Sequence, residues 1–117
     1  MAIATYLHAC DASAAAAISG TTMFAAASDE GSALRIYDLA TPTAPALRYE
    51  TGGEGHDSTP RGTRLYDFHG RDGTVIWDVS NASNPDTLGV IDDPTIVFHH
   101  SGDVTPDERY LYICDEL

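Results

Sequence analysis

The sequence predicts an all-β fold, and three observations lead to this prediction. Short runs of β-branched and aromatic residues recur along the chain of 117 residues, and the turns between them are rich in Gly, Asp and Pro. The phrase RIYDLATPTAP at 35–45 returns as VIWDVSNASNP at 75–85, an offset of 40 (75 − 35). Several short strands in a repeat of about 40 residues are typical of β-propeller blades. We therefore expect antiparallel blades that form an incomplete ring.

Each expected unit consists of two strands joined by a tight turn, a Pro-containing loop and a third short strand. The first strand is predicted at 22–28 in one unit and at 64–70 in the next, and the recurring phrase supplies the second strand. The turns DEGSA and GRDGT contain the Asp and Gly residues that short hairpin loops prefer. After the Pro-containing loops, ALRYE at 46–50 and TLGVID at 87–92 are predicted as third strands.

The two ends of the chain are predicted to belong to partial units. The alanine-rich segment 12–19 has high helix propensity but is too short for a stable helix, so we expect it to be extended or irregular. Near the other end, the apolar segment 94–100 precedes a polar turn at 106–108. A strand is predicted after this turn at 110–114, and it aligns with RLYDF at an offset of 45 (109 − 64).

These segments divide a single partial domain, residues 1–117, into units at 1–19 (partial), 20–55, 56–98 and 99–117 (partial). Propellers need about four to eight blades to close. We therefore expect missing blades of a longer chain, or copies of this chain in a homo-oligomer, to complete the ring.

The charge pattern excludes several classes of partner. Eighteen acidic residues oppose six arginines, the chain has no lysine, and the net charge is −12. Nucleic acid is excluded as a partner because a phosphate-binding face needs clustered cations. Membrane insertion is not expected, because no apolar run approaches the roughly 20 residues that span a bilayer. The opening residues show no signal peptide. Cys10 and Cys114, which form no CxxC pair, are predicted to be buried free thiols, and a bridge between them is the less favoured alternative.

Histidines recur where each unit begins and are the candidate metal ligands. His8, His56, His99 and His100 precede successive strand pairs. Because a propeller brings equivalent positions onto one ring, histidines that are distant in sequence can converge on a copper or zinc ion. The predicted metal set is His56, His99 and His100 with Asp57, and Asp57 or Asp103 is expected to orient an imidazole.

For the histidines a structural role stays open as an alternative to metal binding, and for two aspartates a structural role is favoured. A repeated histidine can also recur because every blade needs the same turn. Calcium is a further candidate cofactor, although no D-x-D-x-D-G loop is present. Asp38 and Asp78, which close the recurring strands, are predicted to accept hydrogen bonds from backbone N–H groups of the next loop rather than to act in catalysis. No catalytic residue is assigned.

Two parts of the sequence resemble known bacterial repeat proteins. MFAAASDEGSALRIYDLATPTAP and RLYDFHGRDGTVIWDVSNASNP resemble the units of LVIVD-repeat proteins. HDSTPRGTRLYDFHGRDG and HHSGDVTPDERYLYICDEL resemble the histidine-led segments of the related choice-of-anchor B surface proteins. The resemblance covers Thr21 to Leu117 and implies a β-propeller in an exported or cell-surface protein. Gly55 stands where relatives often have a cysteine, which removes one disulfide or thiol role.

The residue patterns and the family resemblance lead us to expect one of two functions. The leading one is a non-catalytic binding or scaffold domain that recognises a protein or carbohydrate ligand and, by the resemblance, is extracellular or in the cell envelope. The alternative is a metal-dependent enzyme or metal-binding protein whose histidine site lies in the propeller channel. Whether the chain is an enzyme stays open at this point.

Overall fold

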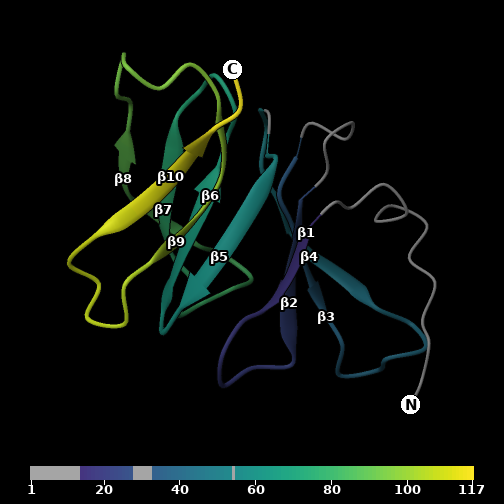
Figure 1. The fold of residues 1–117 in the computed structure, drawn as a ribbon. Coiled ribbons are helices and arrows are strands. Elements are labelled where there is room, and N and C mark those ends of the chain that lie inside the picture. Colours follow the sequence, from purple (N-terminus) through teal and green to yellow (C-terminus); the bar gives the residue numbers. More distant parts are fainter. Residues whose placement is uncertain (1–13, 28–32, 54) are drawn as a thin grey trace.

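A computed structural model describes residues 14–27, 33–53 and 55–117, and all regular elements in these ranges are β-strands (Figure 1). The all-β prediction is confirmed, and the described residues contain no helix able to cross a membrane. The ten strands are β1 (Ala14–Ala17), β2 (Met23–Ala27), β3 (Arg35–Asp38), β4 (Ala46–Glu50), β5 (Asp57–Arg61), β6 (Arg64–Phe68), β7 (Thr74–Asp78), β8 (Asp86–Ile91), β9 (His99–Val104) and β10 (Leu111–Asp115).

The strands form three antiparallel sheets in which sequence order is also spatial order. The first sheet contains β1 to β4, the second contains β5 to β8, and the third is the hairpin of β9 and β10. The two larger sheets therefore have four strands, one more than each predicted unit. The additional strands are β1 and β5, so the first sheet starts inside the segment 1–19. The segment 94–100 contributes to a strand only from His99 onward.

The first two sheets repeat the same pairing, including its irregularity. Ile36 and Tyr37 lie on either side of a register shift between β3 and β4, and Ile76 and Trp77 lie on either side of the same shift between β7 and β8. Both pairs are related by the offset of 40 that the sequence shows. Because a β-bulge bends a strand and increases its twist, a shared bulge gives the two sheets a shared shape.

The second sheet is packed on both faces. On one side of β6, Leu65 is fully buried in a cluster with Ile36 of the first sheet, and the ring of Trp77 packs edge-on against Tyr49 at a centroid distance of 5.9 Å. On the other side, Tyr66 and Phe68 are buried against the third sheet, where they meet Val104, Leu111 and Ile113. This alternation follows from the two-residue period of a strand, and it makes β6 the centre of the described structure.

The third sheet corresponds to the second at an offset that differs by one from the predicted 45. Leu111 packs toward the preceding sheet, as Leu65 does, whereas an offset of 45 would match Leu65 with Tyr110. The offset for β10 is thus 46 (111 − 65). The two hairpins also differ in turn length: Arg61 pairs with Arg64 across two residues in β5 and β6, whereas Thr105 bonds to Tyr110 across the four residues 106–109. A shift of one residue exchanges the two faces of a strand.

The aspartates that close β3 and β7 have the predicted structural role. Asp38 Oδ1 accepts a hydrogen bond from the backbone N–H of Ala40 at 2.9 Å, and Asp78 Oδ1 accepts one from Ser80 at 2.8 Å. Asp38 also accepts hydrogen bonds from Thr22 and Arg48. These contacts, with the Thr22 hydroxyl first, lower the pKa of Asp38 to about 2, and the Ser80 contacts lower the pKa of Asp78.

Replacement of Leu65 by alanine is expected to lower the free energy of unfolding by about 2 to 5 kcal/mol, because it leaves a cavity between the first two sheets. Leu88→Ala is the matched control: Leu88 is 54% exposed on β8, and its loss should change the free energy of unfolding by less than about 0.5 kcal/mol. Urea denaturation measures both. Equal effects of the two substitutions would contradict the packing described for β6.

Asp38→Asn is expected to destabilise the protein at pH 7 and to have a diminishing effect in acid. The pKa of Asp38 is about 2 in the fold, below the value of about 3.9 for an unfolded aspartate. Its contribution is therefore fully present above about pH 4 and is lost as the pH falls through the folded value. Denaturation curves of the variant and of the original chain at a series of pH values measure the difference. Asp92→Asn, in an exposed loop, is the control, and a pH-independent difference for Asp38→Asn would contradict the assignment.

Candidate functional site

Two histidines and a carboxylate come together where β5 and β9 begin. His56 directly precedes β5, His100 is the second residue of β9, and Glu116 directly follows β10. Each of the three offers a ligand atom, and these atoms lie within 4.8 Å of one another. The two imidazole rings are tilted by 50°, with their centroids 4.5 Å apart. We call this group the His56–His100–Glu116 cluster.

The neighbours of this cluster orient its side chains. Nδ1 of His100 lies 3.1 Å from the Ser101 hydroxyl, and Nε2 of the same ring lies 3.8 Å from Oε1 of Glu116. The ring of His56 packs edge-on against Phe98 at a centroid distance of 5.2 Å. Phe98 also accepts, through its carbonyl oxygen, a hydrogen bond from the backbone N–H of Glu116 at 3.4 Å. The cluster is half-buried, with the His100 side chain 37% exposed and that of Glu116 52% exposed.

The predicted set of metal ligands is only partly brought together. His56 and His100 meet, but His99 is buried and its Nδ1 lies 2.8 Å from the Thr74 hydroxyl. Successive side chains on a strand point to opposite faces, and this separates His99 from His100. Asp57 accepts a hydrogen bond from the backbone N–H of Ser58 at 2.6 Å and is not in the cluster.

The remaining predicted polar residues lie elsewhere. Asp103 lies 3.4 Å from Arg61 and does not orient a histidine of the cluster. Cys114 is exposed, so the prediction of a buried thiol is wrong for this residue. It lies two residues after Tyr112 on β10 and therefore on the same outer face, which none of the described sheets covers. His8 and Cys10 lie outside the described residues.

Sequence reasoning missed Glu116. Its position depends on the antiparallel pairing of β9 with β10, which places Asp115 opposite His99 at the start of β9. The residue after β10 is thereby brought beside Phe98 and His100. The signal was present in the predicted strand 110–114, because a hairpin returns the chain to its starting end, but the sequence alone does not give the partner of each residue.

A second polar group, also missed, is enclosed by the second sheet. Oδ2 of Asp67 lies 2.8 Å from Nε2 of His69 and accepts a hydrogen bond from Nε1 of Trp77 at 3.0 Å. The side chain of Asp67 is fully buried and that of His69 nearly so. A carboxylate and an imidazole can exchange protons, but burial prevents contact with a substrate. We therefore assign this group to the core of the sheet.

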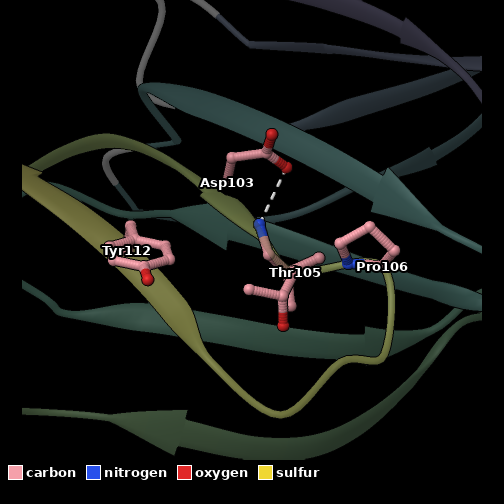
Figure 2. Close-up of a pocket in the computed structure, with 5 residues that line it drawn as sticks. Asp103, Thr105, Pro106 and Tyr112 are labelled. Atoms are coloured by element: carbon pink, nitrogen blue, oxygen red, sulfur yellow. Dashed lines mark hydrogen bonds between the residues drawn. The ribbon is translucent and has the colours of Figure 1, made fainter.

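A pocket of about 170 Å³ lies on the outer side of the third sheet, at the turn between β9 and β10 (Figure 2). Its lining consists of Asp103, Val104, Thr105, Pro106 and Tyr112. Ligand pockets are usually about 300 to 1,000 Å³ and enclose most of the ligand. This pocket is smaller and open, so it is not a ligand site by itself.

No protein-family model matches the chain, and no curated protein matches it.

Asp67→Ala is expected to lower the free energy of unfolding by about 3 to 5 kcal/mol, because it leaves His69 and the Trp77 N–H buried without this carboxylate. Asp103→Ala is the control, since the Asp103 side chain is 71% exposed and its ion pair is of the weak surface kind. The fluorescence of Trp77 during urea unfolding reports on both variants. A cost for Asp67→Ala that is no larger than the cost for Asp103→Ala would show that the buried group is not structural.

Proposed function

We propose that the chain is a run of β-propeller blades, of the LVIVD-repeat kind, that serves as a non-catalytic binding or scaffold domain. The observation that carries this proposal is the pair of four-stranded sheets with one register and one bulge position, stacked face to face through β6. Blades of a propeller are four-stranded antiparallel sheets arranged around a central channel.

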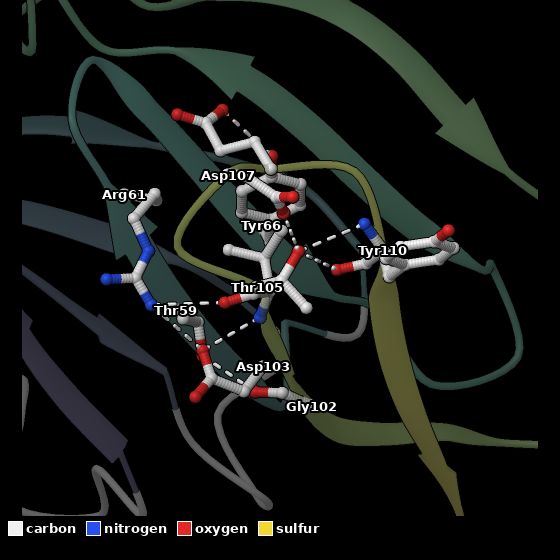
Figure 3. Close-up of polar contacts among 10 residues, drawn as sticks. Thr59, Arg61, Tyr66, Gly102, Asp103, Thr105, Asp107 and Tyr110 are labelled. Atoms are coloured by element: carbon white, nitrogen blue, oxygen red, sulfur yellow. Dashed lines mark hydrogen bonds and ion pairs between the residues drawn. The ribbon is translucent and has the colours of Figure 1, made fainter.

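The positions of the first strands of the three sheets support the proposal that the sheets are arranged around one axis. β1 contacts β5, and β5 contacts β9, so the leading strand of each sheet is next to the leading strand of the following one. Figure 3 shows polar contacts that join β5 to β9. Thr59 donates a hydrogen bond to the carbonyl oxygen of Gly102 at 2.8 Å, and Arg61 donates one to that of Val104 at 3.1 Å. Leading strands that lie next to one another are expected of inner strands around a channel.

The exposed outer face of the third sheet supports the proposal that a further blade packs there. At the offset of 46, Tyr66 corresponds to Tyr112 (66 + 46). Tyr66 is 5% exposed because the third sheet covers it, whereas Tyr112 is 67% exposed. Tyr110, which directly precedes β10, is also exposed. A fourth sheet packed on Tyr112 would repeat the contact that the third sheet makes on Tyr66.

The chemistry of the described residues favours binding over catalysis. The buried Asp67–His69 pair is closed to substrate, and the pocket near Tyr112 is too small to enclose a ligand. A propeller presents loops from successive blades at one end, which suits recognition of a protein or carbohydrate surface. The resemblance to LVIVD-repeat proteins extends the proposal to a role outside the cell or in its envelope.

The proposal predicts that the purified chain associates with itself as its concentration rises, because open blades leave apolar surface exposed. Size-exclusion chromatography with light scattering measures the mass, and thermal unfolding measures cooperativity. Tyr112→Ser should shift the association to higher concentration. Val97→Ser, which removes an exposed apolar side chain from a loop, should not. A monodisperse monomer with one cooperative melting transition at all concentrations would contradict the propeller.

A further inference from the structure

We propose that His56, His100 and Glu116 form a binding site for a divalent transition-metal ion of the zinc and copper class. This inference goes beyond the scaffold function and does not rest on it, because it depends on the side chains at one place in the structure. The three ligand atoms lie within 4.8 Å of one another although the residues are up to 60 positions apart (116 − 56).

The types of donor select the class of metal. Two imidazole nitrogens and one carboxylate oxygen form a ligand set that zinc accepts, with a fourth position left for water. Imidazole also suits copper and nickel. Calcium prefers six to eight oxygen ligands, and this cluster provides two nitrogens instead. The calcium alternative is therefore not favoured at this site.

Contacts beside the cluster orient its ligand atoms before a metal ion binds. The Ser101 hydroxyl holds Nδ1 of His100, so Nε2 is the nitrogen that faces Glu116. A hydrogen bond to the second ring nitrogen is the usual arrangement for a histidine that binds metal. Phe98 packs against the His56 ring and restricts its rotation. Ser101 and Phe98 are thus positioning residues for the site.

Metal binding requires the ligand atoms to move together from separations of up to 4.8 Å. Ligand atoms bound to zinc at about 2.0 to 2.1 Å in a tetrahedron are roughly 3.4 Å apart, whereas Nε2 of His100 and Oε1 of Glu116 are 3.8 Å apart. Glu116 is exposed and directly follows the last strand, so its side chain can rotate toward the two rings. The side chains of His100 and Glu116 are partly exposed, which gives the ion a path of entry.

Local and overall charge favour a cation at this position. Two neutral imidazoles and one carboxylate around a divalent ion leave a local charge of +1. The chain as a whole carries −12. A negative protein field raises the local concentration of cations. The charge of the chain is therefore expected to favour binding of a divalent cation at this site.

The test uses the full chain, freed of metal with a chelator and titrated with Zn²⁺ by isothermal calorimetry. We expect one ion per chain, and we expect the Co²⁺-loaded protein to show the visible absorption of a site with nitrogen ligands. His56→Ala and His100→Ala should abolish binding at concentrations that saturate the original chain. Glu116→Gln should weaken it, and because Glu116 is exposed this substitution should leave the fold intact. Ser101→Ala should weaken binding by about 10-fold through the orientation of His100.

Matched controls separate this site from the one that the sequence suggests. His99→Asn keeps a hydrogen-bonding group near Thr74 and should bind Zn²⁺ as the original chain does, because His99 is not a ligand. Asp92→Asn controls for the loss of an exposed carboxylate. Circular dichroism of each variant verifies the fold. Absence of 1:1 binding, binding unchanged in folded His100→Ala and Glu116→Gln, or binding lost in folded His99→Asn would each overturn the proposal.

Discussion

The two-sided burial of β6 is the constraint on which the described structure depends. Leu65 requires an apolar face on one side of the second sheet, and Tyr66 with Phe68 requires one on the other. A single sheet cannot satisfy both faces, so the second sheet is stable only between two neighbours. Each neighbour then has an outer face of its own, which explains why Tyr112 is exposed where Tyr66 is covered.

The turns between the strands determine the register in which the strands of these stacked sheets pair. Asp38 and Asp78 close their strands by accepting backbone hydrogen bonds, and the bulge follows the same pattern in both sheets. In the third sheet the turn at 106–109 is two residues longer than the corresponding turn of the second sheet. The register that follows this turn points Leu111 toward the second sheet. The short loops therefore decide which side chains join the core, even though the strands supply its apolar surface.

The alternation of side chains along a strand also decides which polar side chains are buried and which are exposed. Asp67 and His69 lie on the strand and turn that fill the centre, and they are enclosed with Trp77. His99 and His100 are neighbours in sequence, yet one is buried beside Thr74 while the other faces Glu116 at the partly exposed end of the sheet. Access to water, rather than residue type, therefore distinguishes a structural histidine from a candidate ligand in this protein.

The sequence by itself determined the all-β class, the repeat of 40 residues, the strands that carry apolar alternation and the aspartate-closed turns, because each of these depends on neighbours along the chain. It did not reveal β5, whose Ser58, Thr59 and Pro60 lack an apolar pattern. This segment forms a strand because it pairs with β6 and lies against β1 and β9. It also suggested His56 and His100 without Glu116. Only the tertiary structure decided that grouping, because antiparallel pairing joins residues whose separation in sequence has no fixed relation to their distance in space.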